Sequence, residues 1–202
     1  GCYDYVDIEE KAMVAGFAVD LSENGYRVTA ELVSSSGGSD SEIQSKIAYS
    51  EGKTLSECLR NMISESSKKL DFGHCKIIFI SKTAAEQGID PILDIIFHND
   101  EIKVSIDLAV VRDNEAAAIF QTDPILSPIV SYEAQKTLES MSHYLSVSPQ
   151  GFSYKALNHI ASIGTELVLP MFAIRESEQR NSFYLNGCAY FKDDHLAGEL
   201  TE

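Results

Sequence analysis

The sequence predicts an α/β fold (mixed α+β), in which a mixed β-sheet flanked by helices is followed by a smaller region made of helices and a hairpin. From residue 43 onward, segments with strand and helix character alternate, an order typical of α/β domains whose later strands are parallel. Before them, the Asn24-Gly25 turn signal separates two apolar segments, as in a β-hairpin. With 202 residues, 44% of them hydrophobic, the chain is long enough to bury a substantial core.

The first three strands are predicted from apolar runs and alternation. Residues 13–20 are almost continuously apolar, as in a strand buried on both faces, whereas residues 26–32 alternate between apolar and polar side chains. Residues 34–41 contain mainly serine and glycine and predict a loop. Partial alternation over residues 43–49 then predicts a third strand.

The helix signal with the most supporting features begins at Thr54. Thr54 and Glu57 match a capping box, in which the two side chains accept hydrogen bonds from each other's backbone amides. An apolar stripe follows and contains Leu55, Cys58, Leu59, Met62 and Ile63. We expect this helix to extend to about Lys68, with Lys68-Lys69 near its C-terminal end, where cations are favoured. Leu55, Leu59 and Met62 should then pack onto the sheet that contains Ile77 and Phe79.

Two more strands and a helix complete the first region. Residues 76–80 are mostly apolar and predict a central strand. Asp90-Pro91 matches an N-cap followed by proline at the first helical position, and residues 106–111 form another apolar run.

A polar stretch that ends in Asp123-Pro124 predicts a domain boundary. We therefore expect an N-terminal mixed-sheet α/β domain over residues 1–122 and a second, smaller domain over residues 123–202. The second should contain a helix after Ser127-Pro128, a short helix near residues 153–160, a strand at 166–174 and a hairpin over residues 183–200. Because the hairpin ends with the sequence, we expect a fragment that stops before a further C-terminal domain.

Charge and hydropathy limit the classes of partner. The net charge is −15, from 31 acidic and 16 basic residues, so the protein should repel nucleic-acid phosphates. The acidic residues are spread along the chain, as on a solvated surface that aids solubility. The apolar runs are far shorter than the ~20 residues of a membrane-spanning helix.

Motifs for catalysis or cofactor binding are not found in the sequence. It has no G-x-S-x-G, Gly-rich phosphate loop, H-E-x-x-H or C-x-x-C, so we predict no catalytic, cofactor or metal-binding residues and no enzyme. Three of the four cysteines, Cys58, Cys75 and Cys188, should be buried free thiols. Among the histidines, His74 is the strongest candidate for a functional role because it lies at a turn before a buried strand. We favour a structural role, in which its ring forms a hydrogen bond to the backbone of that turn.

Cys2 is the candidate modification site. In bacterial lipoproteins the signal is removed before a cysteine that carries the lipid, and that cysteine commonly follows a glycine, as Cys2 follows Gly1. A hydrophilic segment over residues 3–11 follows and would serve as a tether. The alternatives are an ordinary free thiol and a residue introduced by cloning, since Gly1 would be lost on processing.

Short motifs are spread over nearly the whole chain: residues 1–4, 14–20, 26–29, 52–54, 72–80, 100–103, 168–170 and 187–192. In their order and spacing these motifs resemble those of the spore germination receptor C-subunit lipoproteins, also called Ger(x)C. Two residues depart from the family pattern. Tyr3 stands where tryptophan is usual, and Cys75 where an aliphatic residue is usual.

The resemblance implies a non-enzymatic subunit of a nutrient-germinant receptor, lipid-anchored at Cys2 on the outer face of the spore inner membrane. Its partners would be integral-membrane receptor subunits, and it would act as a protein-interaction scaffold. Whether it binds a small molecule directly is left open. The alternative is a lipid-anchored solute-binding protein, which a deep pocket with convergent polar groups would indicate. An enzyme ranks third.

Overall fold

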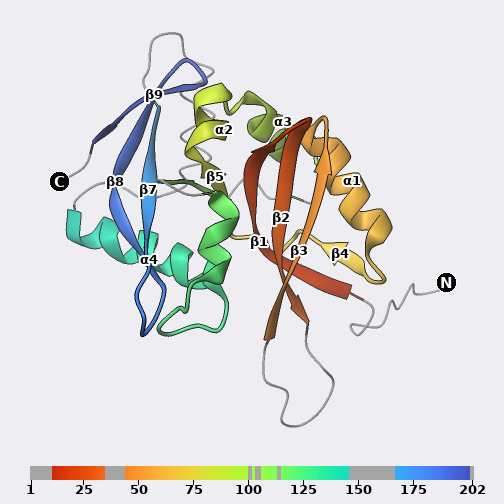
Figure 1. Cartoon of the computed structure of the whole chain (residues 1–202), viewed down its shortest axis with the longest axis horizontal. Helices are drawn as coiled ribbons and strands as arrows, with labels where there is room; N and C mark the ends of the chain where they lie inside the picture. The colour runs from red at the N-terminus through yellow and green to blue at the C-terminus, as the bar shows by residue number, and fades with distance from the viewer. Residues whose placement is uncertain are drawn as a thin grey trace, which may run out of the picture.

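The computed structural model describes residues 11–34, 44–99, 102, 106–112, 115–145 and 167–200. It contains a nine-stranded mixed sheet in the order β3-β2-β1-β5-β6-β7-β8-β9, with β4 paired to β1 (Figure 1). The predicted mixed α/β fold is confirmed. The strands are β1 (Lys11–Ser22), β2 (Gly25–Ser34), β3 (Gln44–Gly52), β4 (Lys69–Asp71), β5 (Ile77–Ser81), β6 (Asp107–Val111), β7 (Leu167–Arg175), β8 (Ser182–Lys192) and β9 (His195–Leu200).

The predicted hairpin is confirmed as the antiparallel pair β1 and β2, and β3 adds to β2 as predicted. Gly25, the glycine of the predicted turn, has a φ of 145°, which side chains strongly disfavour. The later strands are parallel, also as predicted: β5 pairs with β1 and β6, and β6 pairs with β7. The carboxyl ends of β1, β5 and β6 therefore lie at the same edge of the sheet.

Helix α1 (Leu55–Glu65) begins where the capping box predicts, but it ends earlier than expected. Thr54 accepts from the Glu57 amide, whereas the Glu57 carboxylate accepts from the amide of Lys53. Predicting helix to about Lys68 was wrong, because the Ser66 hydroxyl forms a turn with the backbone of Lys68 and Lys69 begins β4. Pairing of β4 with β1 thus determines where the helix ends.

Two short helices follow β5. Helix α2 (Lys82–Gln87) was not predicted, and Ser81 caps it by accepting from the Ala84 amide. Helix α3 (Asp90–His98) was predicted, but Asp90 is its first residue and not its cap. The N-cap position is Ile89, a residue that has no side-chain acceptor.

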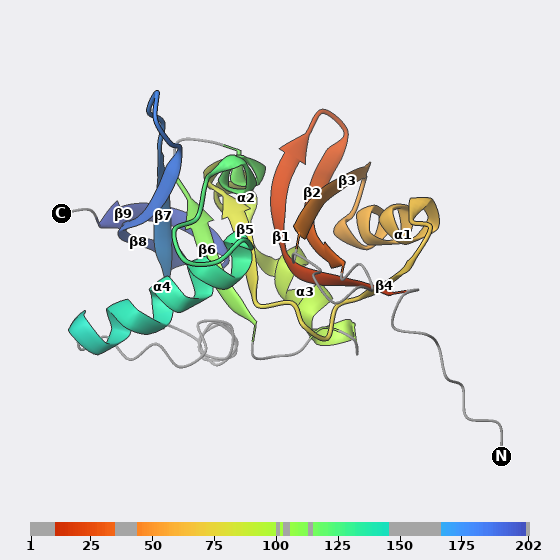
Figure 2. The ribbon, with the colours of Figure 1, turned by 90° about the horizontal axis from the view of Figure 1, so that it is seen from below.

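Alternation along β5 divides the core between the two faces of the sheet. Ile78 and Ile80 pack with α1, α2 and α3, whereas Ile77 and Phe79 pack with α4 (Val130–Leu145) and the 3-10 helix η2 (Ala116–Gln121). The prediction that α1 packs onto this sheet is therefore correct, but its core lies on the face opposite to Ile77 and Phe79. Figures 1 and 2 show α1 beside β1–β3 at one end of the molecule and α4 beside β7 and β8 at the other.

Helix α4 follows the predicted Ser127-Pro128 signal, but its first amides are capped from β2. Glu31 accepts from the amides of Val130 and Ser131 at 2.9 and 2.8 Å. The first turn of α4 also lies close to β1 at Gly16. A Cβ atom there would lie 2.8 Å from the carbonyl oxygen of Ile77 and would also meet the Ser131 side chain.

The predicted second region contributes strands to the same sheet. The predicted strand and terminal hairpin are present as β7, β8 and β9, and β7 pairs directly with β6. The sheet is thus continuous across position 122, and the division into domains at 1–122 and 123–202 stays a prediction. The short helix predicted near residues 153–160 lies outside the described residues.

Candidate functional site

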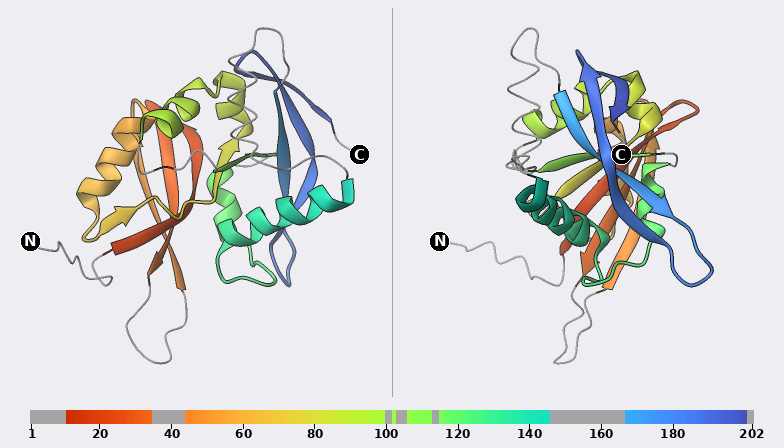
Figure 3. Two further views of the ribbon diagram at one scale, coloured as in Figure 1. Left: turned by 180° about the vertical axis from the view of Figure 1, so that it is seen from behind. Right: turned by 90° about the vertical axis from the view of Figure 1, so that its left-hand side faces the viewer.

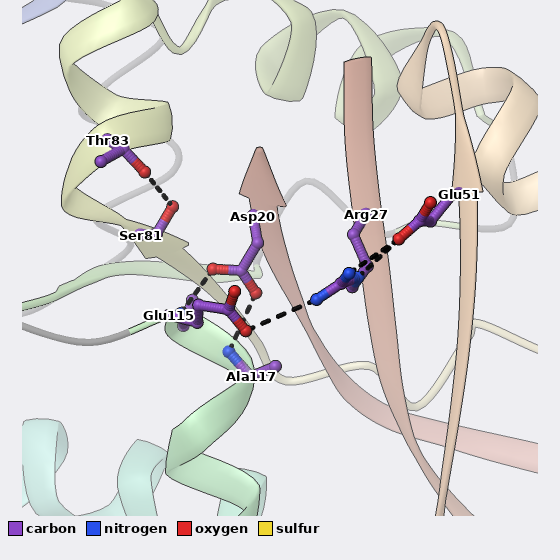
Figure 4. Close-up of polar contacts among 8 residues, drawn as sticks. Asp20, Arg27, Glu51, Ser81, Thr83, Glu115 and Ala117 are labelled. Carbon is purple, nitrogen blue, oxygen red and sulfur yellow. Dashed lines mark hydrogen bonds and ion pairs between the residues drawn. The ribbon is translucent and has the colours of Figure 1, made fainter. Parts of the chain in front are cut away.

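A buried carboxylate lies at the carboxyl ends of the parallel strands. Asp20, near the end of β1, is 1% exposed and accepts hydrogen bonds of 2.6 and 3.1 Å from the amides of Ala116 and Ala117 (Figure 4). Burial raises the pKa of Asp20, which the two amides partly oppose. Through these two hydrogen bonds the buried carboxylate joins β1 to η2.

Arg27 connects two acidic residues near Asp20. Its guanidinium lies 2.8 Å from the carboxylate of Glu51 on β3 and 3.5 Å from that of Glu115, which precedes η2 (Figure 4). Beside Asp20, the hydroxyls of Ser81 and Thr83 lie 3.2 Å apart. The ion pairs are partly exposed, so they stabilise the fold only modestly.

A second polar network connects the strand edge to the terminal hairpin. The carboxylate of Glu199 on β9 lies 2.6 Å from the Lys82 ammonium and 3.2 Å from the Arg112 guanidinium. Arg112 also donates to Asn186 on β8 at 2.9 Å. Every charged group in this network has an opposite charge beside it, so the arrangement is suited to holding the hairpin in place.

The histidines do not form a reaction centre within the described part of the chain. His74 is exposed, and its Nδ1 lies 3.9 Å from a carboxylate oxygen of Asp71. That distance is too long for a hydrogen bond, and within the described residues the ring does not form the hydrogen bond to the turn that we favoured. His195 pairs with the adjacent Asp194, and His98 contacts a carbonyl of its own helix. Among the described residues, no three His, Cys, Asp or Glu side chains are placed to hold a metal ion.

The cysteines agree in part with the expectation of buried free thiols. Cys58 and Cys75 are free and buried, and burial raises their pKa values to about 11 and 12. Such thiols remain protonated at neutral pH and are poor nucleophiles. Cys188 is free but only half-buried, which corrects the prediction. Cys2 lies outside the described residues, and its lipidation stays a prediction.

A surface groove of about 940 Å³ lies between α1 and α3, which we call the α1–α3 groove. Figure 3 shows the two helices beside each other in the view from behind. Both apolar and polar side chains line it: Thr54, Leu55, Ser56, Leu59, Arg60, Ile63, Phe72, Pro91, Asp94, Ile95, His98 and Asn99. The sequence did not reveal this groove, because no local pattern shows which helices become neighbours.

Another surface feature is the loop that precedes α4. It exposes Ile125 and Leu126 by 68% and 91%. The Glu133 carboxylate accepts hydrogen bonds of 2.7, 2.7 and 2.8 Å from the amides of Ile125, Leu126 and Ser127. Burial opposes ionisation of Glu133, but these amides lower its pKa overall. Two aliphatic side chains are therefore exposed on a loop whose backbone is already ordered.

Comparison with known families gives a match over most of the chain. The model described as the spore germination protein N-terminal domain matches residues 4–174, which include β1 through β7 almost completely. The matched segment crosses position 122. The hairpin formed by β8 and β9 lies beyond the matched residues.

Curated relatives have low identity but extensive coverage. YfkR of Bacillus subtilis (strain 168), a protein named for spore germination, is 24% identical and covers 97% of this chain and 53% of its own length. Spore germination protein GerQC of Bacillus cereus is 24% identical, with 95% and 52% covered. Spore germination protein KC of B. subtilis is 23% identical, with 69% and 37% covered. The chain thus spans about half the length of these relatives, or less.

No solved structure is significantly similar to this chain. Across the described residues, each helix is too short or too polar to cross a membrane.

Proposed function

The chain belongs to the spore germination protein N-terminal domain family, and from that membership we propose that it is part of a non-enzymatic lipoprotein subunit of a spore nutrient-germinant receptor. In this proposal the subunit is anchored through Cys2 at the outer face of the spore inner membrane. It acts as a scaffold that binds integral-membrane receptor subunits during germination. The family match and the germination proteins among its relatives support the receptor context.

The ordered loop at Ile125 and Leu126 supports the scaffold role most directly. The loop exposes two adjacent aliphatic side chains. Docking would bury them, and burial of apolar surface favours association by about 25 cal/mol per Å². Three hydrogen bonds to Glu133 already order the backbone, so docking would cost little further conformational entropy. This combination is suited to a contact with another protein.

Co-purification of the full-length protein with its membrane neighbours, with and without germinant, tests the proposal. We expect the integral-membrane subunits to be recovered with the wild-type protein and to be depleted with Leu126→Asp. The matched control is Gln179→Asp, which adds the same charge at an exposed position of the β7–β8 turn. If the wild-type protein recovers no membrane subunit, the scaffold proposal fails.

The solute-binding alternative predicts that the protein itself binds a small molecule. Under the scaffold proposal, calorimetry of the protein with candidate amino acids and sugars should show no saturable heat. Tight binding of one such nutrient would favour the alternative, and substitution of residues in the α1–α3 groove would then locate the site.

A further inference from the structure

We propose that the outer edge of β3 binds an extended segment of a partner protein as an additional strand of the sheet. This inference deepens the proposed scaffold function and rests on it. It assigns to that function a second surface, distinct from the loop at Ile125 and Leu126, and it specifies the backbone conformation of the segment that the surface receives.

The β3 strand is the outermost strand at its end of the sheet, and within the described residues it pairs with β2 alone (Figure 1). Alternation along the ladder shows which of its peptide groups face outward. Ser22 and Gly25 face each other across the β1–β2 turn, so the even-numbered residues of β2 face β3. These residues pair with even-numbered residues of β3. The peptide groups of Ser45, Ile47 and Tyr49 therefore point away from β2.

A side chain of α1 supports this assignment and marks where the open part of the edge ends. The side-chain amide of Asn61 donates to the carbonyl of Glu51 at 2.9 Å. Glu51 is odd-numbered, so its carbonyl has the same orientation as those of Ile47 and Tyr49. In the part of the chain that the structure describes, no group bonds to the outward-facing amides and carbonyls from Ser45 to Tyr49. Such a row of backbone donors and acceptors is a template for another strand.

The β3 strand lacks most of the features that protect an edge from pairing. It has nine residues, contains no proline and pairs with β2 without a register shift. Lys46 is the single charged residue between Ser45 and Ser50. At the opposite end of the sheet, β9 has six residues, and its pairing with β8 contains a register shift. Because short and irregular strands are poor templates, strand addition is favoured at β3 over β9.

A groove of about 750 Å³ follows this edge between β3 and the end of α1, and we call it the β3 edge groove. Ile47 and Tyr49 border it and are 48% and 66% exposed. Ile47 pairs with Glu31, which caps α4, so these two side chains lie on the face of the sheet opposite α1. On the α1 side, the groove reaches Met62 and Leu70, which belong to the core. An added strand would place alternate side chains beside Ile47 and Tyr49 and the others against the end of α1.

The geometry specifies the occupant. The outward peptide groups recur at every second residue, about 7 Å apart, which is the repeat of an extended chain. A second copy of this protein fits the edge less well, because it would bring its own α1, which packs on β3, to the same place. Glu65 at the end of α1 is exposed in each copy, and each chain has a net charge of −15, so two copies also repel each other. An extended segment of another protein avoids both conflicts.

Two N-methylated peptides test the edge directly. Both are fluorescein-labelled and alternate valine with threonine between terminal lysines. The first carries N-methyl groups on every second residue, which blocks one of its edges and leaves the other able to pair. The second carries them on every residue, so its side chains are the same but its backbone donors are removed. At physiological salt, fluorescence anisotropy should show saturable binding of the first peptide and binding of the second that is weaker by about tenfold or more.

A proline variant tests the protein side of the contact. Tyr49→Pro removes an outward N–H that β2 does not use, so the fold should persist and binding of the first peptide should weaken by about tenfold or more. The matched control is Gln179→Pro, which introduces proline at an exposed position of the β7–β8 turn and should bind as the wild type does. Circular dichroism checks that both variants fold. The comparison of the two peptides on the wild-type protein does not depend on either variant.

Amide hydrogen exchange gives a readout at single residues. In the free protein, the amides of Ile47 and Tyr49 should exchange faster than those of Ala48 and Ser50, which face β2. Saturation with the first peptide should slow exchange at Ile47 and Tyr49 by about tenfold or more. Equal affinity for the two peptides, absence of saturable binding, or equally slow exchange at all four amides of the free protein overturns the proposal. Dimerisation in sedimentation that Tyr49→Pro abolishes would assign the edge to a second copy instead.

Co-purification separates this inference from the function on which it rests. We expect the full-length protein with Tyr49→Pro to recover less of the membrane subunits than the wild type, and Gln179→Pro to recover as much. If Tyr49→Pro recovers them equally well, the scaffold function stands and the edge assignment fails. If the wild-type protein recovers none, the scaffold function itself fails.

Discussion

The carboxylate of Glu31 accepts a hydrogen bond of 2.6 Å from the hydroxyl of Ser131, a residue that follows 100 positions later in the chain. Both residues are almost completely buried. The same carboxylate accepts from the amides of Val130 and Ser131, so it neutralises the amino-terminal end of α4. A charged residue of the β1–β2 hairpin thus positions the helix that packs on the face of the sheet formed by Ile77 and Phe79.

Glu31→Gln should destabilise the protein. The amide keeps the shape of the carboxylate, but it removes the charge and turns an NH₂ group toward N–H donors. A hydrogen bond to a charged group contributes about 1.5–3 kcal/mol, so we expect a loss of roughly 2 kcal/mol or more in the free energy of unfolding. Urea unfolding measures it. The control is Glu23→Gln in the exposed β1–β2 turn, which should change stability by no more than about 0.5 kcal/mol.

A double-mutant cycle with Ser131→Ala would isolate the side-chain contact. We expect the two substitutions to be less than additive, because either one removes the bond between Glu31 and Ser131. Simple additivity would show that the contact contributes nothing to stability.

Leu59→Ala should lower the melting temperature markedly. Leu59 is buried in the core beneath α1, and truncating a buried leucine costs about 2–5 kcal/mol through lost burial and a residual cavity. For a chain of this size, each kcal/mol lowers the melting temperature by roughly 2–4 °C. Ile63→Ala on the same helix is the control, since Ile63 is half-exposed. Equal shifts for the two variants would contradict the described packing of α1.

Glu133 should make the loop before α4 sensitive to acid. The pKa of Glu133 is lowered from 4.5, because the amides of the loop outweigh the opposing effect of burial. Since the folded state favours the charged form, the stabilisation is complete above pH 4.5 and is lost as pH falls through the lower folded pKa. Stability should therefore decrease in that acidic range.

Comparison with Glu133→Gln isolates this contribution. Urea unfolding of both proteins between pH 3 and pH 6 should show the largest difference above pH 4.5, and the difference should shrink toward pH 3. A difference that stays constant over this range would show that the Glu133 carboxylate is not preferentially ionised in the folded protein.

Cys2 should carry acyl chains in the native full-length protein. Burial of acyl chains in a membrane contributes about 0.8 kcal/mol per CH₂, so Cys2→Ala should move the protein from the membrane fraction to the soluble fraction. Mass spectrometry of the native N-terminal peptide measures the modification directly. Cys188→Ala should leave membrane retention unchanged. Unmodified Cys2 in membrane-bound protein would exclude the anchor.

Features that depend on neighbouring residues could be predicted from the sequence. The Asn24-Gly25 turn, the start of α1 at Thr54 and the buried strand β5 all follow from turn chemistry, capping or runs of apolar residues. The end of α1 could not, because β4 competes for the same residues by pairing with β1. The exposure of Ile63 could not either, because its periodicity matches that of the buried Leu59.

The candidate surfaces were decided by the tertiary structure. No local signal brings Glu31 to α4, places α1 beside α3 or adds β7 to β6, since each contact joins segments far apart in the chain. By itself the sequence determined the mixed α/β class, the order of most elements and the family resemblance, all of which are recorded in short-range patterns. The tertiary structure decided which faces are covered and which remain exposed, because burial depends on contacts between segments distant in sequence.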